Sequence, residues 1–212
     1  MSAYAFSRYH SAGPGNAKVG LALAAKILGV VAGLPDIKHI CELGCGNGYL
    51  SGLLARHGYR TVGVDASESG IEIARRMHGE EGQFVCAQID HALPATLGAE
   101  RFDAVISVEV IEHLYRPRDL LECAHELLDP GGWVVLSTPY HGYLKNLALS
   151  VLDAWDTHHT VGWDGGHIKF FSVKTLSSLV AGSGFDIEGF DYLGRMTWLW
   201  KSMICVARKR RT

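Results

Sequence analysis

The chain has 212 residues, which is enough for one domain with a full hydrophobic core. Its 48% hydrophobic and 20% charged residues are ordinary for a globular protein, and a formal net charge of -2 supplies no basic field for nucleic acid. The five cysteines do not suggest a disulfide framework or a zinc site, and no apolar run is long enough to span a bilayer. We therefore expect a single cytoplasmic domain over residues 1–212.

Short apolar runs alternate with helical patterns along most of the chain. Strands are predicted over 37–43, 60–65, 84–89, 102–108, 133–138, 185–190 and 198–208. Helices are predicted over 18–31, 49–56, 68–78, 118–128 and 173–181, with Ser67 and Ser172 as N-caps of two of them. This alternation predicts a doubly wound α/β fold, with a mainly parallel sheet and helices on both faces.

Two segments depart from the alternation. The N-terminal segment and first helix, 1–33, begin with an irregular aromatic stretch that either caps a cofactor or forms a frayed terminus. Residues 140–169 are an insertion after the fifth strand, at the edge where such sheets bind ligands, so we predict a substrate lid. The lid contains an amphipathic helical face made of Leu144, Leu147, Ala148, Val151, Leu152 and Trp155. A membrane-touching helix is the competing interpretation, which a single cation, Lys145, weakens.

The most informative stretch is Cys-Glu-Leu-Gly-Cys-Gly-Asn-Gly at 41–48. It joins the first predicted strand to the next helix, where glycine permits positive φ and the helix presents free N–H groups to a ligand. Its spacing, Gly44-x-Gly46-x-Gly48, differs from the G-x-G-x-x-G of nicotinamide-binding folds. The preceding Glu42 would repel a pyrophosphate but suits a cationic ligand.

Two further features lie at predicted strand ends. Asp65 ends the second strand, about 20 residues beyond the glycine loop, where nucleotide-binding sheets place a ribose-binding acid. The alternative is a simple acid at a helix N-terminus. The fourth strand runs into Glu-Val-Ile-Glu-His at 109–113.

Together these motifs resemble class I S-adenosylmethionine-dependent methyltransferases, and within them the ubiquinone-biosynthesis O-methyltransferase branch, from about residue 37 onward apart from the lid. The resemblance implies a Rossmann-like, seven-stranded sheet with an antiparallel last strand, and S-adenosyl-L-methionine as cofactor with S-adenosyl-L-homocysteine as product. It implies cofactor contacts from Glu42, Gly44, Cys45, Gly46, Asn47, Gly48, Tyr49, Asp65, Ala66, Ser67, Gln88, Ile89, Asp90 and Val108. In this assignment Asp90 meets the adenine amino group and Ile89 stacks on the base.

Methyl transfer to oxygen requires removal of the hydroxyl proton and an in-line approach to the methyl group. We predict His113 as the base, Glu112 as its orienting group and His167 as a second histidine facing the acceptor. The alternatives are a polar surface pair and a loop histidine. The residues Tyr140, His141, Tyr143, Trp155, Trp163 and Trp198 could line an aromatic acceptor pocket, although simple packing is equally consistent and is favoured for Trp198.

Glu109, Glu112, His113 and His167 could also bind a divalent cation, with manganese or zinc suited better than magnesium. Metal-assisted RNA 2′-O-methyltransferases use a similar E-x-x-E-H with a later histidine, but this chain has no basic channel. A divalent metal therefore stays an alternative that we do not favour, as does a nucleic-acid partner, while a homodimer is compatible with the sequence. The predicted function is O-methylation of a small-molecule hydroxyl, such as a phenol or quinol. N- or C-methylation, metal-dependent RNA methylation and a non-catalytic cofactor-binding protein are the alternatives, and a nicotinamide reductase is disfavoured.

Overall fold

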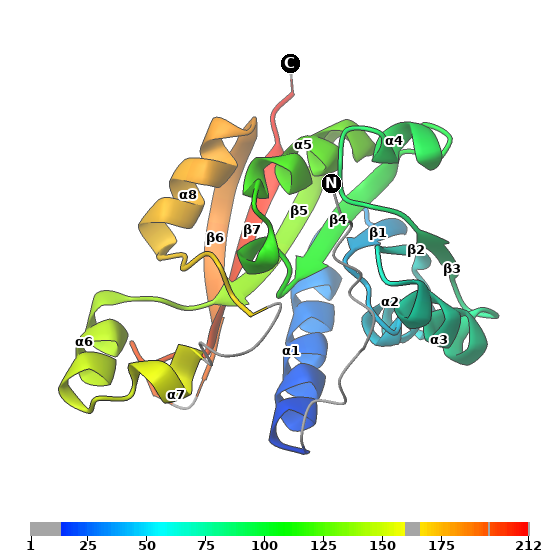
Figure 1. Cartoon of the computed structure of the whole chain (residues 1–212). Helices are drawn as coiled ribbons and strands as arrows, with labels where there is room; N and C mark the ends of the chain where they lie inside the picture. Colours follow the sequence, from blue (N-terminus) through cyan, green and yellow to red (C-terminus); the bar gives the residue numbers. More distant parts are fainter. Residues whose placement is uncertain (1–13, 160–165, 195, 212) are drawn as a thin grey trace.

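The structure is a computed structural model that describes residues 14–159, 166–194 and 196–211 (Figure 1). Most of the aromatic N-terminal segment, and Trp163 of the lid, lie outside the described residues. None of the described helices combines the length and apolar character that crossing a membrane requires.

A seven-stranded sheet forms the centre of the molecule, in the order β3-β2-β1-β4-β5-β7-β6. The strands are β1 (His39–Leu43), β2 (Arg60–Asp65), β3 (Gln83–Cys86), β4 (Phe102–Val108), β5 (Leu128–Pro139), β6 (Phe185–Leu193) and β7 (Ser202–Lys209). β1 to β5 pair in parallel, and β7 runs antiparallel to both β5 and β6. The predicted fold class and the antiparallel last strand are confirmed.

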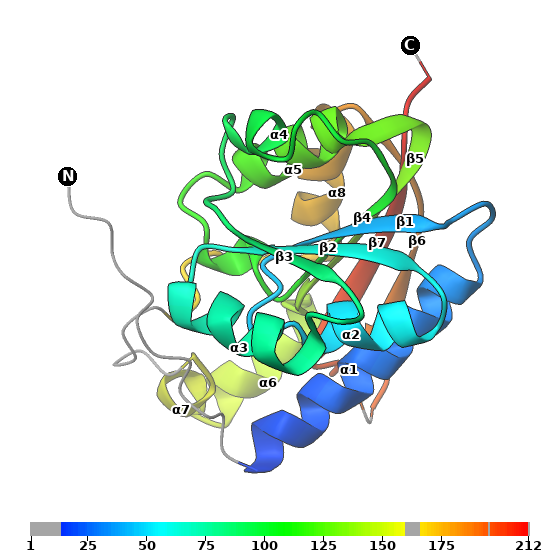
Figure 2. The same cartoon turned by 90° about the vertical axis from the view of Figure 1, so that its right-hand side faces the viewer.

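Helices cover both faces of the sheet (Figure 2). One face carries α1 (Pro14–Ala32), α2 (Tyr49–Arg56) and α3 (Glu68–His78), and the other carries α4 (Leu93–Thr96), α5 (Pro117–Leu127) and α8 (Val173–Gly182). Ile27 and Leu54 belong to the core under α1 and α2, while Leu121 and Val180 belong to the core under α5 and α8. Because both faces are covered, the central strands are buried along most of their length, which explains their continuous apolar sequences.

The strand order places a binding crevice at the carboxyl ends of the parallel strands. From β1 the chain builds outward through β2 and β3, and then returns to pair β4 with the opposite side of β1. Ligands bind at such a reversal, outside the carboxyl ends of the strands. This end of the sheet therefore brings together the glycine loop after β1, Asp65 at the end of β2 and Val108 at the end of β4.

Several element boundaries differ from the prediction. β3 ends at Cys86 instead of residue 89, so Gln88, Ile89 and Asp90 lie in the loop that follows. Cys86, expected in the core, is exposed because it ends a short strand at the sheet's edge. Residues 129–132, expected as a turn between elements, fall within β5, where the register slips from Phe102–Leu128 to Ala104–Trp133. The short elements α4, η1 (Ile111–His113) and α7 (Trp155–His159) were not predicted, because single turns have no readable periodicity.

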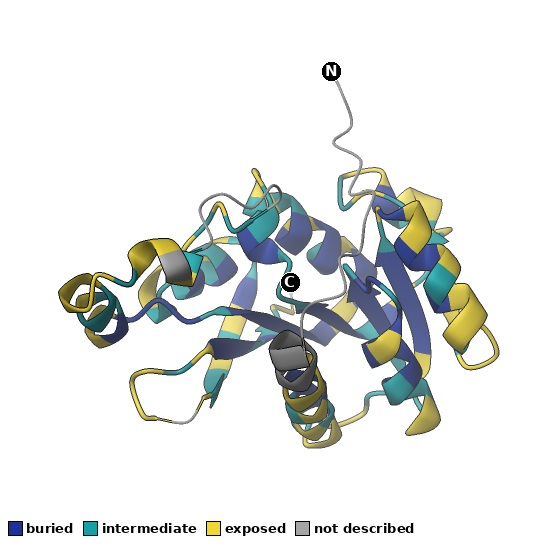
Figure 3. Cartoon of the chain, turned by 60° about the horizontal axis from the view of Figure 1, so that its bottom comes forward, coloured by how far each residue is buried: buried dark blue, intermediate teal, exposed yellow. Residues whose placement is uncertain are grey.

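The insertion at 140–169, which we predicted to be a lid and call the lid below, forms α6 (Tyr143–Val151) and α7, which lie together to one side of the sheet (Figure 1). The apolar face expected from the sequence is turned outward: Leu144 is 50% exposed, Val151 76% and Leu152 73%. Lys145, in contrast, is only 7% exposed. Figure 3 shows the same arrangement, since this outlying helix pair carries mostly the colours of exposed and intermediate residues.

Candidate active site

The glycine loop between β1 and α2 is folded tightly against its neighbours. Gly44, Gly46 and Gly48 all have positive φ, at 82°, 53° and 76°. The Gly44 N–H donates to the Val64 carbonyl oxygen at 2.7 Å, and a Cβ on Gly44 would lie 2.3 Å from Val110 Cγ2. Gly44 is therefore required both for its backbone conformation and for the lack of a side chain.

Asp65 connects the end of β2 to this loop. Its Oδ2 accepts a hydrogen bond from Gly46 N at 2.8 Å, and its Oδ1 accepts one from Ser67 N at 2.8 Å. Ser67 caps α3 as predicted, with its hydroxyl oxygen accepting from Gly70 N. Each carboxylate oxygen retains a further lone pair, so Asp65 can still accept from two ligand hydroxyls.

A cavity of about 420 Å³ opens in front of these groups. Its walls are formed by Gly44, Gly46, Asp65, Ala66, Ser67, Gln88, Ile89, Val108, Glu109, Val110, His113 and Leu114. Most of the predicted cofactor residues thus share one cavity with the predicted base, His113. Val110 and Leu114 were missed, although their position beside Val108 and His113 after β4 could have indicated them.

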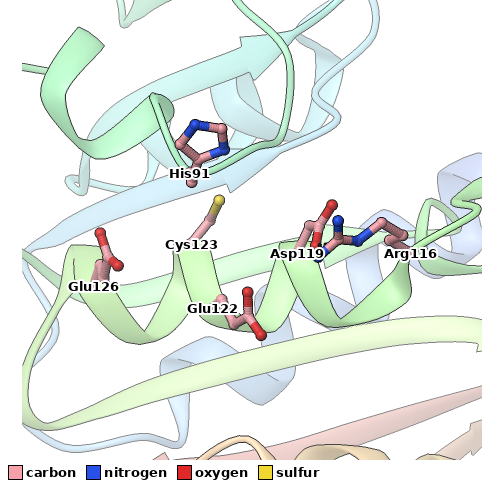
Figure 4. Close-up of a pocket in the computed structure, with 6 residues that line it drawn as sticks. All are labelled: His91, Arg116, Asp119, Glu122, Cys123 and Glu126. Atoms are coloured by element: carbon pink, nitrogen blue, oxygen red, sulfur yellow. Dashed lines mark ion pairs between the residues drawn. The ribbon is translucent and has the colours of Figure 1, made fainter.

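A second, smaller cavity of about 90 Å³ lies elsewhere, against α5 (Figure 4). It is lined by His91, Arg116, Asp119, Glu122, Cys123 and Glu126. None of the predicted site residues belongs to it.

Six predicted cofactor residues lie near the large cavity but outside its lining: Glu42, Cys45, Asn47, Gly48, Tyr49 and Asp90. Asp90 accepts a hydrogen bond from Ala92 N at 2.9 Å and so holds the turn after β3. Cys45 is buried behind the glycine loop in a small core with Phe84. Glu42 is 4% exposed and accepts a hydrogen bond from the Ser51 hydroxyl at 2.5 Å. Burial raises the pKa of Glu42 to about 8.

Glu112, His113 and His167 come together at the other end of the site. The His113 and His167 ring centroids are 4.9 Å apart, and His113 Nδ1 lies 3.2 Å from the Gly166 carbonyl oxygen. Glu112 is fully buried, and its Oε2 accepts a hydrogen bond from the Thr138 hydroxyl at 3.0 Å. Burial, with Glu109 adding to it, raises the pKa of Glu112 to about 8. Burial lowers the pKa of His167 to about 4.

Glu109 occupies a strained position between this group and the cavity. Its φ is 54°, which is rare for a residue with a side chain. Its N–H donates to the Ser137 carbonyl oxygen at 3.1 Å, and its Oε1 accepts from the Ser137 hydroxyl at 2.9 Å. These bonds hold the carboxyl at the cavity wall, where burial raises its pKa to about 7. Backbone strain of this kind concentrates at functional sites.

The predicted aromatic pocket is only partly assembled among the described residues. Tyr140 packs against Tyr192 and Trp200, and Tyr143 is 78% exposed. Trp198 contacts Trp200 at 5.4 Å between ring centroids but is 57% exposed, so packing accounts for only one side of it. The other two described members, His141 and Trp155, both contact His159. The His159 ring centroid lies 5.4 Å from that of His141 and 4.7 Å from that of Trp155.

Comparison with known proteins agrees with this geometry. A family model described as "Methyltransferase domain" matches residues 16–188. The chain belongs to this methyltransferase family. The resemblance seen in the sequence is thus confirmed at the level of the family.

Individual relatives give further detail. A ubiquinone biosynthesis O-methyltransferase of Roseobacter denitrificans is 34% identical over 171 residues, which cover 76% of this chain and 66% of the relative. The chain thus spans slightly less than two thirds of that relative's length.

The fold is similar to that of the magnesium protoporphyrin IX methyltransferase of Synechocystis, solved with S-adenosylhomocysteine. The TM-score is 0.63 at 23% sequence identity, and the match covers 92% of this chain and 83% of the Synechocystis chain. The same enzyme solved with S-adenosylmethionine has a TM-score of 0.61 at 20% identity and covers 92% of this chain and 80% of its own. These structures confirm the fold.

Proposed function

We propose that this methyltransferase transfers the methyl group of S-adenosylmethionine to a hydroxyl oxygen of a small molecule. The observation that carries the proposal is that one cavity joins the glycine loop and Asp65 to His113. The Roseobacter relative named as an O-methyltransferase supports the acceptor atom, and the Synechocystis structures support the cofactor. The bound cofactor supplies a methyl group that its sulfonium already activates.

The residues around the glycine loop fit such a cofactor. A Cβ on Gly44 would collide with Val110, which lines the cavity as Gly44 does, so this part of the cavity wall is bare backbone. Asp65 would accept from the ribose hydroxyls, and Gln88 and Ile89, which line the same cavity, would border the base. The bond from the Ala92 N–H uses only Oδ1 of Asp90, so the second carboxylate oxygen could accept from the adenine amino group.

His113 is suited to act as the base. The Gly166 carbonyl oxygen can only accept, so the neutral ring carries its proton on Nδ1 and its lone pair on Nε2. That tautomer lets Nε2 receive the proton of the acceptor hydroxyl as the methyl group is transferred. Glu112, directly before His113, fixes the backbone on both sides of the site, because its carbonyl oxygen accepts from Ile168 N and Lys169 N.

The test separates cofactor binding from chemistry. The purified protein is supplied with S-adenosylmethionine and a panel of catechols and phenols, and the products are identified by mass spectrometry. We expect His113→Asn to lower kcat by about 100-fold or more, with unchanged affinity for S-adenosylhomocysteine. His91→Asn, at an exposed histidine of the smaller cavity, is the matched control and should leave kcat unchanged. A nitrogen- or carbon-methylated product, or full activity of His113→Asn, would contradict the proposal.

A second candidate is methyl transfer assisted by a divalent cation. Glu112, His113 and His167 each offer one ligand atom, and these atoms lie within 4.8 Å of one another. Glu112 Oε1 is buried, has no hydrogen-bond partner within the described part of the chain and lies 4.0 Å from His167 Nε2. One carboxylate and two imidazoles suit manganese or zinc, although the ligand atoms would have to move somewhat closer together. In this arrangement the acceptor oxygen would be deprotonated with help from the cation.

A further inference from the structure

A group of basic side chains lies where the lid meets the body of the protein. We name it the basic wall and define it as His141, Lys145, His158, His159 and His167. His141 follows β5, Lys145 is on α6, His158 and His159 are on α7, and His167 precedes α8. The His141 ring centroid is 5.4 Å from that of His159 and 6.4 Å from that of His158. Five groups that can carry positive charge are thus gathered from four segments of the chain.

Lys145 is the most unusual member. It is the buried residue of a helix whose Leu144, Leu147 and Val151 are exposed. Its Nζ donates to the Tyr140 carbonyl oxygen at 2.8 Å, which uses one of the three donors of the ammonium group. Burial lowers the pKa of Lys145 to about 8, while the charge of Glu109 opposes that shift. A buried ammonium is costly unless further partners satisfy it.

His141 provides a second buried group with unused hydrogen-bonding capacity. It is 6% exposed, and its Nε2 has no hydrogen-bond partner among the residues that the structure describes. Its backbone N–H donates to Phe171 O, which fixes the residue in place. Burial, and then the charges of Lys145 and the neighbouring histidines, lower the pKa of His141 to about 4. Below pH 8 the Lys145 ammonium group therefore places a positive potential at the buried His141 ring, which an anion would relieve.

The basic wall adjoins the end of the site where the acceptor must lie. His167 is in ring contact with His113, which lines the large cavity. Glu109 lines the same cavity and acts electrostatically on Lys145. The cofactor-binding glycines and Asp65 lie on the ends of β1 and β2, whereas the basic wall belongs to the lid side.

We propose that the basic wall binds an anionic group of the methyl acceptor, a carboxylate or a phosphate, with Lys145 as the residue that determines this specificity. The acceptor is then a hydroxylated small molecule with an anionic substituent held beside His113. Oxygen anions form charge-assisted hydrogen bonds with the remaining donors of the Lys145 ammonium group and with His141 Nε2. This assignment of the acceptor rests on the proposed function, but anion binding itself can be measured without turnover.

The experiment follows histidine side-chain resonances by NMR in protein saturated with S-adenosylhomocysteine. Inorganic phosphate and acetate are titrated separately against chloride at matched ionic strength, which distinguishes the two kinds of anion. We expect saturable shifts of the His141 and His158 resonances for at least one of them, with a dissociation constant on the order of 1 mM. Absence of any saturable shift with both anions would overturn the proposal.

Substitutions identify the residue responsible. Lys145→Met should weaken anion binding about tenfold, whereas Lys145→Arg should retain it. Lys174→Met, at an exposed lysine on α8, is the matched control and should bind like the wild type. Unchanged binding by Lys145→Met would overturn the assignment. If that variant fails to bind S-adenosylhomocysteine and is therefore misfolded, His158→Gln replaces it, because His158 is exposed on α7. Weaker anion binding by His158→Gln would then support the proposal, and unchanged binding would overturn it.

The two proposals can fail separately. Saturable anion binding without an O-methylated product would support anion binding by the basic wall but refute the proposed function. An O-methylated product from neutral acceptors, with no anion binding, would support the proposed function but refute the proposal that the acceptor carries an anionic substituent.

Discussion

Asp65 and Gly46 are joined across the mouth of the site by a hydrogen bond of 2.8 Å from the Gly46 N–H to Asp65 Oδ2. The bond connects the end of β2 to the glycine loop after β1. A single carboxylate thereby fixes the loop and remains available to a ligand. Three expectations about the cofactor end of the site, and one about the catalytic end, follow from contacts of this kind.

Replacing Asp65 should abolish tight cofactor binding. Asp65→Ala removes the carboxylate that we assign to the ribose hydroxyls and also leaves the Gly46 and Ser67 N–H groups without this acceptor. We expect S-adenosylhomocysteine to bind about 100-fold more weakly, as for the loss of two charge-assisted hydrogen bonds. Isothermal titration calorimetry measures the change. Asp186→Ala, at an exposed acid paired with Arg210, is the control, and equal affinities of the two variants would refute the role of Asp65.

Two glycine substitutions should have opposite effects on stability. Gly44→Ala forces a side chain into a residue with φ of 82° and against Val110, so we expect the free energy of unfolding to fall by about 2–4 kcal/mol. Gly29→Ala, on an open face of α1, should raise it by about 0.5–1 kcal/mol. Urea denaturation followed by circular dichroism provides both values. A Gly44→Ala protein as stable as the wild type would show that the loop is not held as tightly as its contacts indicate.

Glu42 should make stability depend on pH. Burial raises its pKa from 4.5 to about 8, so the folded state holds a proton that the unfolded state has lost between these values. This contribution to stability is complete below pH 4.5 and is lost as the pH rises towards 8. Relative to Glu42→Gln, the wild type should therefore lose unfolding free energy across this range.

Urea denaturation of both proteins at several pH values tests this sign. The buried acids Glu109 and Glu112 have pKa values raised in the same direction and contribute equally to both proteins. The difference between wild type and Glu42→Gln therefore isolates residue 42. Parallel stability curves would mean that Glu42 ionises in the folded protein much as it does in the unfolded chain.

Removing divalent ions should leave the reaction intact if His113 alone accepts the proton. We expect EDTA-treated protein to keep both its affinity for S-adenosylhomocysteine and its kcat. Loss of kcat that manganese restores in the wild type, but not in Glu112→Gln, would instead favour the cation-assisted candidate. The affinity for S-adenosylhomocysteine serves as the internal control, because we assign the cofactor to the glycine loop and Asp65 and the cation to Glu112, His113 and His167.

Much of the cofactor end could be predicted because its signals are local. A strand, a glycine turn and a helix are continuous in sequence, and the positive φ values of Gly44, Gly46 and Gly48 explain why the motif contains these residues. The loop after β3 was harder to predict. Asp90 has the expected residue type, but it lies outside the cavity lining and its Oδ1 accepts from the Ala92 N–H, a local turn that spacing alone does not reveal.

The sequence by itself determined the alternating fold, the glycine loop, Asp65 and the Glu112-His113 pair, because periodicity and turn chemistry act between near neighbours. Only the tertiary structure decided which way the lid faces. The pattern of α6 identifies an apolar stripe but not its partner, whereas Lys145 is buried with its ammonium group bonded to Tyr140 and under the electrostatic influence of Glu109. These groups come from different segments of the chain, and folding brings them together through contacts that no short stretch of sequence records.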